Sequence, residues 1–329
     1  MNKVITYNDK SMTTKYWCEL SDEEYLQLKK DFYKKPPIEE VKKEFLNLAK
    51  GGVKNSAITN YYFKDLMAKT ITWYCKWSLE DVFNCKDLIA KFVAQSKTNT
   101  KLCPPDKPLI KNVETVIRLG GKGCATKPPN FPVKIVDYIL NKYNVNNNWY
   151  DYSCGWGSRL LGALKHNINY WGTDPNYMLC ERLEEMAKLY KETIPKCKSR
   201  IEITSSGSEI YYKEKENTIG LAFSSPPYYN LEDYKIGEQS YKEGLSYEDW
   251  LNNYIEKTVN NIYSYLIPEG YFLININNFK EYNLVSDVRK IIEKSGFKYK
   301  TTEILENIKR VNSNSTFNDN SEGILVFTK

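Results

Sequence analysis

Short apolar runs alternate with amphipathic stretches in the second half of the chain. Each run is rich in β-branched and aromatic side chains and predicts a buried strand. The runs cover residues 149–152, 170–173, 201–204, 219–224 and 271–276. Between the last two, apolar side chains recur at helical spacing from Leu251 to Leu266. Because strands that alternate with helices form parallel sheets covered on both faces, the pattern predicts an α/β fold.

The end of the chain carries two further apolar stretches, at residues 297–305 and 323–327. We expect them to form an antiparallel hairpin at the edge of the sheet. The connection between them, residues 307–322, is long and polar and includes Lys309 and Arg310.

The first 122 residues predict helices instead of strands. The helices are expected at residues 22–34, 38–49, 60–77 and 79–95. Ser21 followed by Glu24 is a capping box at the start of the first one. Residues 96–122 contain Pro-Pro and Gly-Gly pairs without a periodic pattern, which indicates a linker. We therefore expect a helical domain and linker at residues 1–122 and an α/β domain at residues 123–329.

The composition of the chain narrows the class of protein. With 329 residues and 41% hydrophobic content it can bury a large core. It contains no apolar run of 18 residues, and its first residues are polar, so we expect a cytoplasmic protein without a membrane span. The eight cysteines form no Cys-x-x-Cys pair and His166 is the single histidine, so no metal site is expected.

Charge is divided unevenly along the chain. Residues 1–127 hold 23 Lys and Arg against 15 Asp and Glu, whereas residues 128–329 hold 24 against 26. A net charge of +8 in the first part favours a module that binds a polyanion. The alternative is a general richness in lysine, which supplies 41 of the 47 cations.

A glycine turn follows the first predicted strand. Asp151 ends that strand, and Gly155 and Gly157 precede a helix, so backbone can approach a ligand closely there. Asp174 ends the next strand, where a carboxylate can bind ribose hydroxyls or cap the following helix. Leu160 stands where a dinucleotide-binding motif has its third glycine, which disfavours a dehydrogenase.

The fourth strand runs directly into Ser225-Pro226-Pro227-Tyr228. Two prolines end a strand at once, so the chain must leave the sheet there. A hydroxyl, a backbone carbonyl and an aromatic ring leave with it. These groups can bind an exocyclic amino group and stack on a flat base, although an ordinary turn has the same composition.

The glycine turn, the acidic residue and the Ser-Pro-Pro-Tyr run, in this order, resemble the motifs of the amino-group DNA methyltransferases that use S-adenosylmethionine, in particular the phage-type enzymes. The resemblance extends upstream to Asn130-Phe131-Pro132 and covers roughly residues 123–329. It implies a Rossmann-like methyltransferase sheet in which Ser225, Pro226, Pro227 and Tyr228 are catalytic. The cofactor-binding residues that it implies are Asn130, Phe131, Pro132, Asp151, Ser153, Gly155, Gly157, Asp174, Glu209 and Ser224.

Two departures from the family pattern bear on the substrate. Many members have Asp-Pro-Phe where this chain has Asp151-Tyr152-Ser153, which changes the turn beside the cofactor. Family enzymes that act on adenine usually carry Asp or Asn at the position of Ser225, so serine favours N4 of cytosine and leaves N6 of adenine open. The absence of a Pro-Cys dipeptide sets aside methylation of a cytosine ring carbon.

The resemblance implies double-stranded DNA as the partner, with the target base flipped out of the helix, in a bacterial or phage-infected host cell. Residues 1–122 are expected to supply DNA recognition, and the 307–322 connection either contacts DNA or is mobile. Neither the recognition sequence nor the oligomeric state follows from the sequence. The alternatives are an RNA or protein amide methyltransferase and a catalytically silent nucleic-acid-binding protein.

Overall fold

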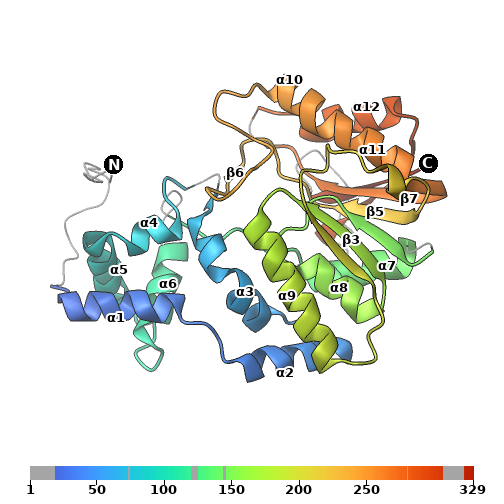
Figure 1. Ribbon diagram of the computed structural model, residues 1–329. Coiled ribbons are helices and arrows are strands. Elements are labelled where there is room, and N and C mark those ends of the chain that lie inside the picture. The colour runs from blue at the N-terminus through green and yellow to red at the C-terminus, as the bar shows by residue number, and fades with distance from the viewer. Residues whose placement is uncertain (1–18, 73–74, 120–124, 144–145, 280, 307–321) are drawn as a thin grey trace. The chain divides into compact units, whose positions relative to one another are not determined.

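The computed structural model describes residues 19–72, 75–119, 125–143, 146–279, 281–306 and 322–329 (Figure 1). The chain divides into two compact units. The helical unit comprises Met1–Lys34 and Tyr74–Lys127, and the sheet unit comprises Lys35–Trp73 and Pro128–Lys329.

The helical unit is built from α1 (Asp22–Tyr33), α4 (Leu79–Phe83), α5 (Lys86–Thr98) and α6 (Leu109–Leu119). The predicted capping box starts α1: the Glu24 amide donates to Ser21 Oγ at 3.1 Å, and the Ser21 amide donates to Glu24 Oε2 at 2.9 Å. The rings of Phe32 and Phe83 stack at 3.9 Å between centroids, which joins α1 to α4.

Three predictions for the N-terminal region were wrong in detail. The expected linker contains α6, whose buried Ile110, Val113 and Ile117 follow helical spacing that the flanking prolines and glycines obscured. The helix expected at residues 79–95 is two helices, interrupted at Asn84 and Cys85. The helix expected at residues 60–77 is α3 (Ser56–Lys69), which ends before strand β1 (Ile71–Thr72) because β1 pairs with β6 (Glu232–Asp233).

The sheet unit contains a seven-stranded sheet in the order β4-β3-β2-β5-β7-β9-β8. The strands are β2 (Asn148–Asp151), β3 (Asn169–Asp174), β4 (Ile201–Ser205), β5 (Ile219–Ser224), β7 (Leu266–Ile276), β8 (Lys298–Ile304) and β9 (Gly323–Thr328). Neighbouring strands from β4 to β7 are parallel, and β9 runs antiparallel to both of its neighbours. The predicted fold, a mostly parallel sheet with an antiparallel C-terminal hairpin, is confirmed.

Helices cover both faces of this sheet (Figure 1). One face carries α7 (Val133–Tyr143), α8 (Ser158–His166) and α9 (Tyr177–Thr193). The other carries α10 (Tyr247–Trp250), a π-helical segment (Leu251–Glu256), α11 (Lys257–Tyr265) and α12 (Leu284–Lys294). Side chains alternate between the two cores, so that Phe223 belongs to the first and the adjacent Ala222 to the second.

The helices α2 (Ile38–Ala49) and α3 belong to the sheet unit, although the expected domain boundary lay at residue 122. Phe45 on α2 and Phe63 on α3 are fully buried in the same core as Leu183 and Tyr190 of α9. The division therefore differs from the expected one because this apolar surface packs on α9.

Two expectations concern other parts of the chain. None of the helices in the described ranges is long and apolar enough to cross a membrane. Of the 307–322 connection, with Lys309 and Arg310, all but Glu322 lies outside the described residues.

Candidate active site

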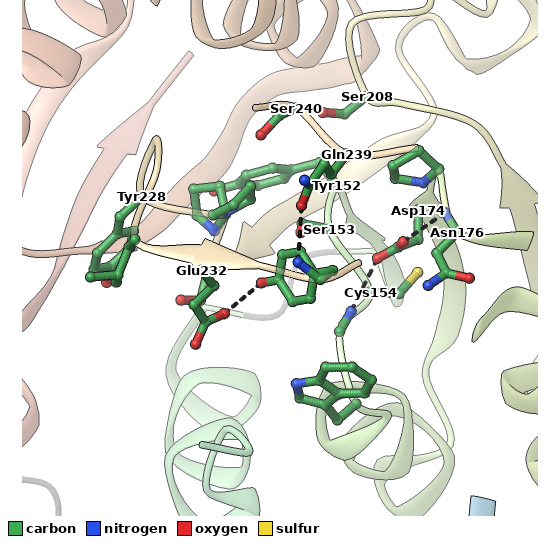
Figure 2. A pocket seen from close by; sticks show the side chains of 18 of the residues that line it. Tyr152, Ser153, Cys154, Asp174, Asn176, Ser208, Tyr228, Glu232, Gln239 and Ser240 are labelled. Carbon is green, nitrogen blue, oxygen red and sulfur yellow. Dashed lines mark hydrogen bonds between the residues drawn. The ribbon is translucent and has the colours of Figure 1, made fainter. Parts of the chain in front are cut away.

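A cavity of about 620 Å³ lies where β2, β3 and β5 end, and all residues that line it belong to the sheet unit (Figure 2). The chain winds from β2 toward β4 in one direction and from β5 toward β7 in the other, so β2 and β5 flank the switch point of the sheet. Open parallel sheets bind ligands at this point, outside the carboxyl ends of their strands.

Asp151, at the end of β2, orders the turn that follows it. Its fully buried carboxylate accepts hydrogen bonds from Arg159 Nε at 2.8 Å and from the Tyr170 hydroxyl at 2.7 Å. Arg159 also donates to the backbone carbonyl of Ser153. The buried ion pair thus ties the turn to α8, while Asp151 itself stays behind the cavity lining.

The two glycines of the turn have different surroundings. Gly155 has a φ of +58°, lines the cavity, and directs its amide at Asp174 Oδ2, 3.5 Å away. Gly157 has a φ of +80° and lies behind the lining, where a Cβ would be 2.8 Å from Met186 Cε and 3.0 Å from Phe63 Cε2. Gly157 therefore serves the packing of α8 against α3 and α9.

Asp174 ends β3 and faces the cavity. Its Oδ1 accepts from the Asn176 amide at 3.1 Å, and its Oδ2 faces Gly155 (Figure 2). Burial raises the pKa of Asp174 to about 6, and the charge of Asp151 acts in the same direction, whereas the two backbone hydrogen bonds oppose the shift. The carboxylate is thus a strong acceptor for a donor placed in the cavity.

The end of β5 delivers Ser225, Pro226, Pro227 and Tyr228 to the cavity lining. Ser224, the residue before them, is fully buried behind the lining and donates to the Ser153 carbonyl at 3.2 Å. It therefore joins the ends of β2 and β5 beneath the site.

Asn275 on β7 is a residue that sequence reasoning missed. Its Nδ2 donates to Ser225 Oγ at 3.0 Å and to the Tyr228 hydroxyl at 3.3 Å, and the Tyr228 hydroxyl donates to the Asn275 carbonyl, also at 3.3 Å. Burial raises the pKa of Tyr228 well above its usual range, with a contribution from Glu322, so the phenol stays protonated. A polar side chain near the carboxyl end of the apolar 271–276 run was the available signal.

The segment between Tyr228 and α10 also lines the cavity, which no sequence pattern indicated. Glu232 Oε2 accepts a hydrogen bond from the Tyr234 hydroxyl at 2.6 Å, and burial raises the pKa of Glu232. Gln239 Oε1 accepts from the Tyr234 amide at 3.1 Å (Figure 2). In this view Glu232 lies between Tyr228 and Asp174.

Two further predicted segments line the cavity. In the Asn130-Phe131-Pro132 run, Asn130 Nδ2 donates to Thr59 Oγ1 at 2.9 Å and to the Trp156 carbonyl at 3.3 Å. Glu209 follows β4 in the short loop at residues 207–209. Eleven of the fourteen predicted site residues thus line one cavity, and Asp151, Gly157 and Ser224 lie behind it.

Residues 219–329 match the model of a family described as DNA methylase, of the N6 and N4 amino-group class. The matched segment is about a third of the chain and resembles a DNA methylase domain. This match bears out, over residues 219–329, the resemblance to amino-group DNA methyltransferases inferred from the motifs.

Solved structures similar to part of this chain are distant in sequence. A TehB-like S-adenosylmethionine-dependent methyltransferase from Corynebacterium glutamicum shares 15% identity over 59% of this chain and 86% of its own, with a TM-score of 0.37. The magnesium protoporphyrin IX methyltransferase ChlM from Synechocystis shares 13% over 59% and 76%, also with a TM-score of 0.37. The [4+2]-cyclase SpnF shares 11% over 60% and 80%, with a TM-score of 0.41. No curated protein matches the chain in sequence.

The residues of the cavity fit S-adenosylmethionine. The volume of about 620 Å³ is ample for a nucleoside with an amino-acid tail. Asp174 supplies a carboxylate for ribose hydroxyls, and Gly155 exposes backbone beside it. The donor set therefore contains the groups that a charged, ribose-containing cofactor requires.

Proposed function

We propose that this protein transfers a methyl group from S-adenosylmethionine to the exocyclic amino group of cytosine (N4) or adenine (N6) in DNA. Ser225 favours cytosine, since adenine enzymes of the family usually carry Asp or Asn there. The observation that carries the proposal is the network in which Asn275 binds both Ser225 and Tyr228 in the cavity that also contains Asp174.

The residues after β5 are assigned to the target base. S-adenosylmethionine supplies an electrophilic methyl group. An exocyclic amino nitrogen is a poor nucleophile because its lone pair is delocalised into the ring. Ser225 Oγ and the backbone carbonyl of Ser225 or Pro226 accept hydrogen bonds from the amino group, which orients the nitrogen and raises its electron density. Tyr228 stacks on the ring of the base.

The target base has to leave the duplex before it reaches these residues. In paired DNA its amino group is hydrogen-bonded to the opposite strand, and Ser225 is only partly exposed. Base flipping is therefore part of the proposal.

Asp174, Gly155 and the Asn130-Phe131-Pro132 run are assigned to the cofactor. Asp174 accepts hydrogen bonds from the ribose, and the Gly155 backbone leaves room for the ligand beside it. Asp151 and Ser224 hold the turn in place through Arg159 and Ser153.

We assign DNA recognition to residues 1–122. The helical unit holds 16 Lys and Arg against 11 Asp and Glu, and residues 35–73 hold 7 against 4. Positive charge binds phosphates without regard to sequence and thereby brings DNA to the protein.

The experiment is an incubation of the full chain with labelled S-adenosylmethionine and unmethylated DNA of mixed sequence, followed by hydrolysis and mass spectrometry of the nucleosides. We expect N4-methylcytosine or N6-methyladenine. RNA and protein substrates run in parallel, and label in either of them alone would replace the proposal by one of the alternatives. Absence of transfer to all three would indicate a silent binding protein.

Two variants at Tyr228 test the assignment of the base. Tyr228→Ala should lower transfer by about 10–100-fold, since stacking on a base contributes about 1–3 kcal/mol. Tyr228→Phe keeps the stacking face and should be milder. Transfer at the parental rate by Tyr228→Ala would contradict the stacking role.

A further inference from the structure

The lining of the cavity is acidic. Its carboxylates are Asp174, Glu209, Glu232, Glu238 and Glu322, and its cations are Arg159 and Lys242. Arg159 is already paired with the buried Asp151, so its charge is largely neutralised. A cavity with this balance favours a ligand that carries positive charge.

Glu232 differs from the other carboxylates in its position and its support. It lines the same cavity as Tyr228 and Asp174, the residues assigned to the base and to the ribose, and in the view of Figure 2 it falls between them. The Tyr234 hydroxyl fixes its Oε2 at 2.6 Å, while β6 anchors its backbone to β1. Among the described residues it forms no ion pair with Lys or Arg.

A half-buried carboxylate without a cation is unfavourable for the free protein. Burial raises the pKa of Glu232, which reflects the cost of holding its charge in the cavity. A cation bound nearby lowers the cost of the Glu232 charge, and this gain in free energy adds to the affinity for a cationic ligand. The cofactor has a positive sulfonium, and its product S-adenosylhomocysteine has a neutral thioether in the same place.

We propose that Glu232 is a residue that discriminates between cofactor and product by charge: its carboxylate, oriented by Tyr234, favours the sulfonium of S-adenosylmethionine over the thioether of S-adenosylhomocysteine. The discrimination limits inhibition by the product, because transfer of the methyl group removes the charge to which Glu232 is attracted. This inference rests on the cofactor and not on the nucleic-acid substrate.

The test is calorimetric titration of the full chain with three ligands and no DNA. S-adenosylmethionine and sinefungin, which carries an amine in place of the methylated sulfur, are cationic there, and S-adenosylhomocysteine is neutral. We expect Glu232→Gln, which keeps an acceptor for Tyr234, to weaken both cationic ligands by about tenfold. Two unit charges about 6 Å apart at an effective dielectric of about 20 would change the affinity by roughly a hundredfold, and the expected effect is well below that limit. The affinity for S-adenosylhomocysteine should change less than about twofold.

The matched control is Glu243→Gln, which removes an exposed carboxylate of the same segment that does not line the cavity. It should affect the three ligands equally and by less than about twofold. A second measurement uses the parental protein alone: rising salt should weaken S-adenosylmethionine more than S-adenosylhomocysteine.

Equal weakening of all three ligands by Glu232→Gln, with an unchanged melting temperature, would overturn the inference, because Glu232 would then shape the cavity without sensing charge. Unchanged affinities of Glu232→Gln for all three ligands would also overturn it. If Glu232→Gln does not fold, equal effects of salt on the affinities of the parental protein for S-adenosylmethionine and S-adenosylhomocysteine would overturn it. Because no DNA is present, these outcomes are independent of the methylation assay that tests the proposed function.

Discussion

Asn275 Nδ2 lies 3.0 Å from Ser225 Oγ and thereby links the carboxyl end of β7 to the first residue after the neighbouring strand β5. The same amide group also contacts the Tyr228 hydroxyl. Its Oδ1 is buried and has no partner within the described part of the chain. An orphaned buried acceptor costs about 1–3 kcal/mol, so the amide is better explained by the positions of Ser225 and Tyr228 than by the stability of the fold.

Asn275→Ala should therefore lower methyl transfer by about 10–100-fold, because Ser225 and Tyr228 lose the donor that orients them. The free energy of unfolding should change by less than about 1 kcal/mol, since the cost of the buried, unpaired Oδ1 is removed together with the hydrogen bonds that Nδ2 donates to Ser225, Tyr228 and Glu322. The affinity for S-adenosylmethionine should stay within about twofold. Methylation kinetics, thermal melting and calorimetry measure the three quantities.

Asn277→Ala is the matched control for Asn275. Asn277 also has a buried Oδ1 without a partner in the described ranges, but it does not line the cavity. It should leave methyl transfer unchanged. Equal losses of transfer in the two variants would mean that Asn275 acts only through the stability of β7.

Asp174 should make cofactor binding depend on pH. Because its pKa in the folded protein is about 6, above the ordinary value near 4, the carboxylate accepts a proton as the pH falls through about 6. The groups that face it are Asp151, Arg159, Cys154 and Tyr234. The affinity for S-adenosylmethionine should therefore be full above pH 7 and fall below pH 6, and calorimetry over pH 5 to 8 measures it.

Asp174→Asn should separate stability from binding. A raised carboxylate pKa means that folding with the charge present is unfavourable above about pH 6, and this penalty disappears as the pH falls toward 4. The variant should therefore raise the free energy of unfolding at pH 7.5 by about 1–2 kcal/mol and weaken the cofactor by about 1.5–3 kcal/mol. A variant that is neither more stable nor weaker in binding would remove Asp174 from the site.

The glycines of the turn should respond in opposite ways to alanine. Gly157→Ala drives a Cβ toward Met186 and Phe63 and should lower the free energy of unfolding by about 2–4 kcal/mol. At Gly155 the nearest atom is Arg159 Nη2, 3.4 Å from the added Cβ, which is an ordinary contact distance, so only the positive φ costs about 1 kcal/mol. Gly155→Ala should lose cofactor affinity more than stability, as melting and calorimetry in parallel would measure.

The lysines of the helical unit test the assignment of DNA binding. Because α2 and α3 share the core of the sheet unit, deletion of the first 122 residues would strip buried surface, and neutralisation of charge is the cleaner change. Replacement of the exposed Lys97, Lys101 and Lys107 by Gln should reduce the slope of log affinity against log salt by about 2–3. Gel-shift titrations at several salt concentrations measure this slope.

A control triple replacement uses exposed lysines of the sheet unit, Lys188, Lys196 and Lys198. It changes the net charge of the chain by the same amount. Equal reductions of the slope in the two triple variants would show that the basic excess of the first 122 residues reflects a general richness in lysine. Selection of the DNA target would then be assigned to the loops of the sheet unit.

The sequence by itself determined the strands that form the sheet and most of the cavity lining. Strands β2 to β5 lie within two residues of the predicted runs, because the alternation of strand and helix is a local sequence pattern. Ser225 to Tyr228 and Asp174 were predictable because residues directly after parallel strands collect at one edge of the sheet.

Only the tertiary structure decided which residues at that edge line the cavity and which lie behind it. Asp151, Gly157 and Ser224 lie behind the lining, since the rotation of a turn depends on distant contacts such as those with Arg159 and Met186. Asn275 and Glu232 reach the cavity from β7 and β6. The pairing of these strands with β5 and β1, which brings the two side chains to the site, is not encoded in any local pattern. Local periodicity fixes the elements of a fold, whereas the meeting of polar side chains from separate elements is a property of their packing.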